Sequence, residues 1–230
     1  MKIISVFGLL TLLALMGGCA ANPATEAYQH TPAVTQKVDN MIVINKPFEQ
    51  AWNDMIKRMT VTQYRINNIE KASRIINLEF QADTPADVEK YIDCGASTRV
   101  ITYKDKPRKF EYKITDSKPY EAVERNKYYY WYNVSPHTNM RGTVNVYMSP
   151  LGGNQTEVSV NARYVLTREF SGTYYTRRQS GEYLEEGNFH WDPRRVTLTT
   201  MKPGIYKEKP FVQCVSRGVL EKEFLNYAGE

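Results

Sequence analysis

His190 and Asp192, separated by one residue, are the pair in this chain best suited to acid/base chemistry. An enzyme that hydrolyses a glycan or a peptide needs a proton donor and a proton acceptor within reach of one bond. The same segment has a simpler interpretation, because Asp192-Pro193 is typical of a loop that leads into a strand. The sequence contains no G-x-S-x-G motif, and Asp54 has no second carboxylate at helical spacing. We therefore expect no catalytic residues, with an envelope glycan or peptide hydrolase as the alternative.

Cys19 is the second candidate for chemistry, and the residues before it give it a context. Lys2 precedes an apolar stretch of 14 residues, Ile3 to Met16. A helix that spans a bilayer needs about 20 apolar residues, so this stretch favours a signal peptide. Met16-Gly17-Gly18-Cys19 resembles the lipobox of bacterial lipoproteins, in which the cysteine receives a diacylglycerol and a further acyl chain such as palmitate. The alternative is a plain secretory signal with Cys19 near the cleaved bond.

The resemblance to bacterial lipoproteins implies a domain order and a location. Residues 1–18 would be the signal peptide, and residues 19–37 would be the lipidated cysteine and a flexible tether with a reach of roughly 20–25 Å. Ala20 stands where an aspartate tends to hold a lipoprotein at the inner membrane, so the resemblance implies the outer membrane. The acyl chains on Cys19 would anchor the protein there. Residues 38–230 would form a single domain facing the periplasm.

The remaining cysteines, Cys94 and Cys214, are expected to form a disulfide bond. Export to an oxidising compartment favours the pairing of two leftover cysteines. Because the enclosed loop is long, this bond would stabilise the folded state by about 4–5 kcal/mol in the chain-entropy model. The alternative is two separate buried thiols. The three histidines lie far from both cysteines in the sequence, so we expect no metal site, and no motif indicates a cofactor.

Aromatic residues form the least ordinary part of the sequence. The run Tyr128, Tyr129, Tyr130, Trp131, Tyr132 would place rings on both faces of a strand. Rings on both faces suit a protein interface, a binding groove or a sugar-stacking surface. The simpler alternative is a sheet that is buried on one side and covered by a loop on the other.

A second aromatic and basic cluster comprises Tyr174, Tyr175, Arg177 and Arg178. It falls within residues 169–193, which are rich in Gly, Tyr, Arg and Glu and which we interpret as a long loop. These side chains suit contact with anionic lipid headgroups, lipopolysaccharide or a protein. The net charge of +5 is a mild excess spread along the chain, so we expect no nucleic-acid partner.

Hydrophobic spacing predicts the elements that position these residues. Pro47 opens a predicted helix whose apolar residues run from Phe48 to Met59 at helical spacing. Two hairpins are expected, one around residues 67–73 and a clearer one formed by residues 140–149 and 157–168 around Gly152-Gly153. The other expected elements are strands at 41–44, 98–103, 110–114 and 195–200, a loop at 81–97, and an amphipathic C-terminal helix over 212–227.

This order of elements predicts an α+β fold, an antiparallel sheet with an early helix and a long C-terminal helix in a helix-grip-like arrangement. Over roughly residues 38–228 the order is similar to that in the domains of the C-component lipoprotein of the β-barrel assembly machine. We expect a non-catalytic scaffold or accessory subunit of a cell-envelope protein assembly, with a partner of unknown identity. The alternative is a carrier of a lipid or other apolar ligand in a cleft between sheet and helix.

Overall fold

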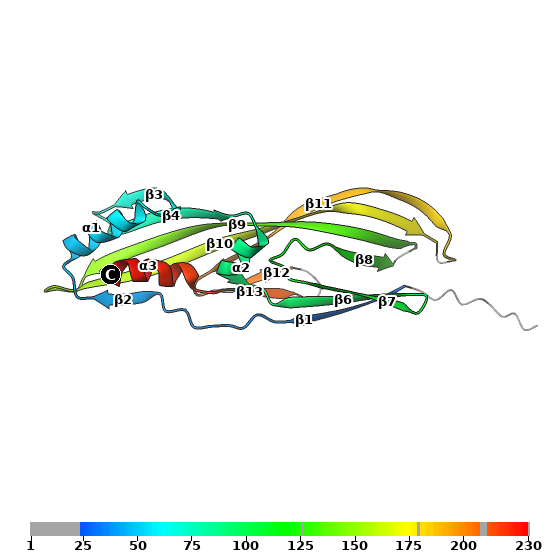
Figure 1. Cartoon of the computed structure of the whole chain (residues 1–230), viewed down its shortest axis with the longest axis horizontal. Helices are drawn as coiled ribbons and strands as arrows, with labels where there is room; N and C mark the ends of the chain where they lie inside the picture. The colour runs from blue at the N-terminus through cyan, green and yellow to red at the C-terminus, as the bar shows by residue number, and fades with distance from the viewer. Residues whose placement is uncertain (1–23, 126, 179, 208–210, 230) are drawn as a thin grey trace, which may run out of the picture.

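One long β-hairpin forms the axis of the computed structural model, which describes residues 24–125, 127–178, 180–207 and 211–229. Strands β9 (Tyr129–Pro150) and β10 (Thr156–Arg177) have 22 residues each and pair without interruption from Tyr129↔Arg177 to Pro150↔Thr156. At 3.2–3.4 Å per residue, such a strand is about 70 Å long. The molecule is accordingly elongated (Figure 1). We call the turn between the two strands the closed end, and the end at Tyr129 and Arg177 the open end.

Shorter strands extend the hairpin on both edges into a seven-stranded antiparallel sheet. The free edge of β9 pairs with β4 (Ile75–Ala82) near the closed end and with β8 (Tyr120–Arg125) near the open end; β3 (Arg65–Glu70) pairs with β4. The free edge of β10 pairs with β2 (Met41–Ile44) and then with β11 (Tyr183–Thr199). The predicted hairpin at 140–168 is confirmed, but the loop expected at 169–193 is wrong. That segment is the second half of β10 and most of β11.

Helices α1 (Phe48–Met59) and α3 (Val219–Gly229) pack on one face of this sheet near the closed end (Figure 1). The predicted helix at 48–59 is confirmed, and it buries Ala51, Trp52, Met55 and Met59. On the sheet, the even-numbered residues of β9 from 134 to 148 and of β10 from 156 to 170 are buried. The odd-numbered residues of the same stretch face the other way, where these helices do not cover the sheet.

The helix-grip expectation is wrong, because the chain is 58% strand and 15% helix. The predicted helix over 212–227 is a strand followed by a short helix: β13 (Val212–Ser216) pairs with β12 (Gly204–Tyr206) and β5 (Ile92–Asp93), and α3 has 11 residues. Gly218, at φ +68°, separates the two elements. The fold is mainly β. The element order that carried the resemblance to the assembly-machine lipoprotein is therefore not the observed one.

A second, three-stranded sheet covers the hairpin at its open end (Figure 1). It has the order β1-β6-β7, formed by β1 (Thr25–Thr31), β6 (Ala96–Tyr103) and β7 (Lys106–Tyr112). Strand β1 lies inside the segment expected to be a flexible tether, so that expectation is wrong for residues 25–31. An edge strand buries little of its surface, so it lacks the clear alternation that marks a half-buried strand. Short helix α2 (Pro85–Tyr91), which begins after the N-cap Thr84, replaces part of the expected loop at 81–97.

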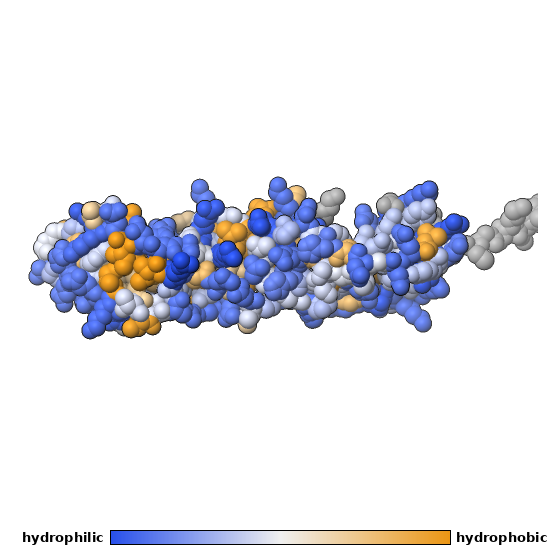
Figure 2. Space-filling view, turned by 90° about the horizontal axis from the view of Figure 1, so that it is seen from above, coloured by the Kyte–Doolittle hydropathy of each residue, from blue (hydrophilic) through white to orange (hydrophobic). Residues whose placement is uncertain are grey.

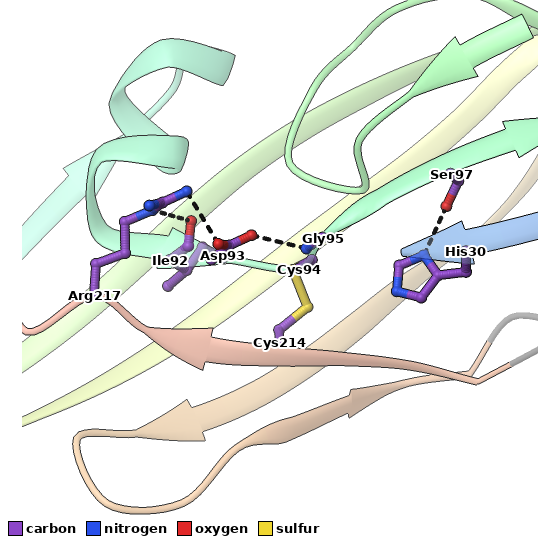
Figure 3. The surroundings of a disulfide bond; sticks show 8 residues. All are labelled: His30, Ile92, Asp93, Cys94, Gly95, Ser97, Cys214 and Arg217. Atoms are coloured by element: carbon purple, nitrogen blue, oxygen red, sulfur yellow. Dashed lines mark hydrogen bonds and ion pairs between the residues drawn. A yellow bond between two sulfur atoms is a disulfide. The ribbon is translucent and has the colours of Figure 1, made fainter. Parts of the chain in front are cut away.

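The expected disulfide between Cys94 and Cys214 is present, with an S–S distance of 2.01 Å (Figure 3). It joins β13 to the link between β5 and β6, across 120 residues of sequence. Beside it, Arg217 lies 3.3 Å from the Asp93 carboxylate, which also accepts a hydrogen bond from the Gly95 N–H. The bond therefore fastens β13, the last strand, to the segment that leads into β6, the middle strand of the three-stranded sheet.

A buried carboxylate joins α3 to the hairpin. Glu221, fully buried on α3, accepts hydrogen bonds from the hydroxyls of Thr200 at 2.5 Å and Tyr164 at 3.4 Å. The Thr200 hydroxyl in turn accepts the N–H of Ala162 at 2.7 Å. A buried polar group is costly unless it is hydrogen-bonded, and these partners provide the bonds. The network fixes the position of α3 over β10.

Candidate functional site

The aromatic run at the start of β9 divides between the two faces of the strand. Tyr129 and Trp131 are buried, whereas Tyr130 and Tyr132 are only partly buried. The ring of Trp131 stacks on Tyr175 of β10, with centroids 5.8 Å apart and planes 4° apart, and meets Tyr103 of β6 edge-on at 5.2 Å. We call Tyr129, Trp131 and Tyr175 the inner aromatic cluster. It lies between the hairpin and the three-stranded sheet.

Charged side chains fasten the three-stranded sheet over the inner aromatic cluster. Arg108 of β7 lies over the Trp131 ring, 5.4 Å from its centroid, and donates two hydrogen bonds of 2.6 Å to the two oxygens of Glu121 on β8. Glu26 of β1 pairs with Arg99 and also accepts the backbone N–H of Val123 at 3.0 Å. The inner cluster is therefore part of the core. For these rings, the simpler alternative holds that the aromatic face of the strand is buried under another part of the chain.

The opposite face carries a second group of rings, which we call the outer aromatic cluster: Tyr130, Tyr132, Tyr174, Phe189 and Trp191. Tyr132 lies 5.4 Å from Phe189 and 5.3 Å from Trp191, and the Phe189 and Trp191 centroids are 4.4 Å apart. Each of these side chains is half-buried. Within the described residues, the ring contacts of this cluster are with β9, β10 and β11. Tyr132, Phe189 and Trp191 also pack against the main hydrophobic core.

Two details shape this outer surface. Gly187 lies opposite Tyr174 on β11, and a Cβ atom there would come within 2.9 Å of the tyrosine ring, so glycine lets the ring lie against the strand. Burial and the neighbouring Glu124 carboxylate raise the pKa of Tyr132, so its hydroxyl stays neutral. The outer cluster thus presents aromatic surface and neutral hydroxyls.

Phe189 and Trp191 are the functional candidates that sequence reasoning missed. The composition of residues 169–193, rich in Gly, Tyr, Arg and Glu, predicts a loop and therefore conceals these two residues. The signal was present: Phe189 and Trp191 alternate with the polar His190 and Asp192, as expected of a strand with one apolar face.

The open end also carries the predicted basic residues. Arg177 donates a hydrogen bond to the Gly181 carbonyl at 3.0 Å and lies over the Tyr175 ring, while Arg178 is paired with Glu182 at 3.4 Å. Tyr128 is half-buried beside Lys127, whose ammonium lies 5.4 Å from its ring centroid. The structure therefore brings the predicted residues between 128 and 132 and between 174 and 178 together at one end of the hairpin. Some lie on its inner face, some on its outer face and some at the open end itself.

His190 and Asp192 do not form an enclosed site. Both side chains are exposed and lie on β11, on the face opposite to Phe189 and Trp191. Neither lines any of the surface hollows described below.

The predicted lipid-binding cleft is filled by the protein's own side chains. Tyr164 on the sheet and Leu220 and Phe224 on α3 are fully buried, and the hydrogen-bonded Glu221 lies among them. A hollow of about 640 Å³ lies elsewhere, on the exposed face of β3, β4, β9 and β10. It is lined by Gln63, Arg65, Glu79, Phe80, Gln81, Arg141, Gly142, Thr143, Arg163 and Val165.

Cys19, the predicted lipidation site, lies outside the described residues. Within the described ranges no group of three or more His, Cys, Asp or Glu side chains is arranged to hold a metal ion. No helix in those ranges is long and apolar enough to cross a membrane. Comparison of the chain with family models, curated proteins and solved structures gives no match.

Proposed function

We propose that this protein is a lipid-anchored outer-membrane lipoprotein that acts as a non-catalytic accessory subunit of a cell-envelope protein assembly, and that the outer aromatic cluster is its contact surface. The observation that carries the proposal is the division of aromatic residues between two faces of one hairpin. The inner face is covered by a second sheet, whereas the rings of the outer face stay half-buried, with Tyr132, Phe189 and Trp191 packed against the main hydrophobic core on one side. Tyrosine and tryptophan are enriched at the energetic centres of protein interfaces.

The position of Ala24 gives the proposed anchor a geometry. Ala24 packs with Ile101, Tyr129 and Trp131 at the open end of the hairpin. A chain from Cys19 to Ala24 spans at most about 18 Å even when fully extended. Acyl chains on Cys19 would therefore hold the open end close to the membrane surface, with the closed end pointing away from it.

The chemistry of the open end agrees with that orientation. Arg125, Lys127, Arg177 and Arg178 lie at this end, together with Lys104 in the turn between β6 and β7. Asp105, Glu124 and Glu182 lie at the same end, and Glu182 pairs with Arg178. Basic residues near an anionic surface each contribute about 1 kcal/mol of attraction, and tyrosines favour the interfacial region. The outer aromatic cluster would then face a partner beside the membrane.

Photo-crosslinking in intact cells tests the proposal. A photoreactive amino acid replaces Tyr174 in the outer cluster, and the matched control replaces Tyr147, which is also partly exposed on the hairpin but lies near its closed end. We expect a discrete adduct of higher mass at position 174 and little at position 147. Recovery of monomer alone with the photoreactive residue at position 174 would contradict the proposed contact surface.

A further inference from the structure

A row of asparagines crosses the exposed face of the sheet near the closed end. Asn68, Asn77, Asn145 and Asn161 are partners in register on β3, β4, β9 and β10. Asn77 donates to Asn145 at 2.7 Å, and Asn40, which precedes β2, donates to Asn161 at 3.0 Å. We call these five residues the amide row. It runs across the strands, on the face opposite to α1 and α3.

Arginines lie next to the amide row. The adjacent line of paired residues contains Arg65, Glu79, Thr143 and Arg163, and Arg141 lies beside it, paired with Gln81. The three arginines are exposed, and none of them has an ion pair or side-chain hydrogen bond with another described residue. Glu79 is the single acidic residue lining the groove, so the groove carries a positive charge that the described chain does not neutralise.

Two smaller hollows share lining residues with the groove or with each other. The groove of about 640 Å³ shares Arg163 with a hollow of about 280 Å³ lined by Asn145, Asn161 and Thr199–Met201. That hollow shares Thr199–Met201 with a third, of about 370 Å³, which includes Asn40 and Lys202. Strands lie 4.7–4.9 Å apart, so the path from β3 to β2 is about 19 Å long. This length suits an extended ligand rather than a small molecule.

From these features we propose that the arginine groove and the amide row bind an extended anionic glycan. An asparagine amide offers both donors and acceptors, which suits the hydroxyls of sugars. Arginine forms paired hydrogen bonds with carboxylate or phosphate groups. The proposal concerns a different face from the outer aromatic cluster and does not depend on the protein partner.

The geometry favours a glycan over a peptide. An extended peptide commonly binds by adding a strand to a free sheet edge, where backbone groups remain unpaired. The groove instead crosses the middle of the sheet, where β4, β9 and β10 are paired on both edges. Recognition must therefore come from side chains, and these side chains are amides, hydroxyls and guanidinium groups.

Titration calorimetry of the purified full-length chain tests the proposal with four probes of similar length. They are a uronate oligosaccharide, a phosphorylated oligomannose, a neutral cello-oligosaccharide and poly-glutamate. We expect binding of one or both anionic glycans, weakened by salt, and much weaker binding of the neutral oligosaccharide. The two anionic probes distinguish recognition of carboxylate from recognition of phosphate. Binding of poly-glutamate with equal or higher affinity, or no binding of either anionic glycan, would overturn the proposal.

Variants localise the binding. The double change Arg141→Gln and Arg163→Gln should weaken binding of the anionic glycan at least tenfold, and Asn145→Ala should weaken it severalfold. Lys57→Gln, which removes an exposed charge from α1, is the matched control and should leave the affinity unchanged. Circular dichroism verifies that the variants are folded. Equal affinity of the double variant and the control would overturn the assignment to this groove, whereas crosslinking at position 174 should be the same in both.

Discussion

Trp131 and Tyr132 are neighbours in the chain, but their rings belong to opposite faces of β9 and to different environments. Trp131 is 3% exposed and lies beneath the three-stranded sheet, stacked on Tyr175. Tyr132 is half-buried among the rings of β10 and β11. Adjacent aromatic residues thus have separate roles, one in holding the two sheets together and the other in forming a surface.

Replacing each of these two residues with alanine should therefore lower the free energy of unfolding by a different amount. Trp131→Ala removes a buried ring and should lower the free energy of unfolding by about 3–5 kcal/mol. Tyr132→Ala removes a half-buried ring at the surface and should cost much less, on the order of 1 kcal/mol. Urea denaturation of both variants measures the difference. Equal losses would show that the outer cluster is part of the core and not a contact surface.

The disulfide should make a large contribution to stability. It closes a loop of 120 residues and joins elements from distant parts of the sequence. Replacing both cysteines, Cys94→Ala with Cys214→Ala, should lower the free energy of unfolding by about 2–5 kcal/mol. The control is the wild-type protein with reductant, which should show a similar loss. Two reactive thiols in the denatured protein without reductant would contradict the bond.

Gly95 should be intolerant of substitution, since it has φ +73° and a Cβ atom there would lie 2.0 Å from the Thr31 carbonyl oxygen. Gly95→Ala should therefore destabilise the protein by more than about 1 kcal/mol, the usual cost of positive φ alone. Gly153→Ala is the control, because Gly153 also has positive φ but no atom within 4 Å of the added carbon. Thermal denaturation compares them, and a Gly95→Ala loss no greater than that of Gly153→Ala would argue against the close approach of β1.

Alkaline pH should destabilise the fold through Tyr164. Burial, followed by the nearby Glu221 carboxylate, raises the pKa of Tyr164 above its ordinary value of 10.0. The unfolded chain therefore loses this proton at lower pH than the folded protein does. The contribution of Tyr164 to the free energy of unfolding is fully present below about pH 10 and is lost as the pH rises above that value.

The melting temperature as a function of pH, compared between wild type and Tyr164→Phe, measures this contribution. The variant should show a shallower alkaline decline. Tyr64 carries a similarly raised pKa, caused first by burial and then by its hydrogen bond to Glu223, so part of the decline should persist. An unchanged slope in Tyr164→Phe would contradict the role of this buried hydroxyl.

Local sequence patterns predicted the parts of the fold that depend on nearby residues. The helix at 48–59 follows from its proline and its apolar spacing, and the hairpin turn follows from Gly152-Gly153, which have φ of +88° and +58°. The Cys94–Cys214 pairing followed from counting cysteines. The helix and the turn are determined by residues that lie close together in the sequence, and the disulfide is determined by a small number of cysteines.

The wrong predictions concern elements that depend on distant partners. Strand β1 is stabilised by pairing with β6, about seventy residues later, and has no apolar pattern of its own. Gly172, Gly181 and Gly187 gave residues 169–193 the composition of a loop, although the segment pairs with β9 on one side and folds back on itself as β11. Val212 and Val215 fit a helical pattern, but pairing with β12 and β5 makes them a strand.

The candidate surfaces depend on sheet register, so the sequence could not show them. The amide row draws on five separated segments, and its members align only when four strands and the segment before β2 are in place. The outer aromatic cluster combines the predicted Tyr130, Tyr132 and Tyr174 with Phe189 and Trp191, which a misassigned loop concealed. The sequence shows each asparagine and each aromatic residue, but it does not show which of them lie side by side on neighbouring strands.

Crosslinking from position 174 in intact cells tests the central claim most directly when wild type is compared with Cys19→Ser and with Trp191→Ala. The account predicts a discrete protein adduct in the wild type, a severalfold lower yield when the proposed anchor is removed, and loss of the adduct when the aromatic surface is truncated. Monomer alone in the wild type, or the same adduct at equal yield in all three proteins, would contradict it.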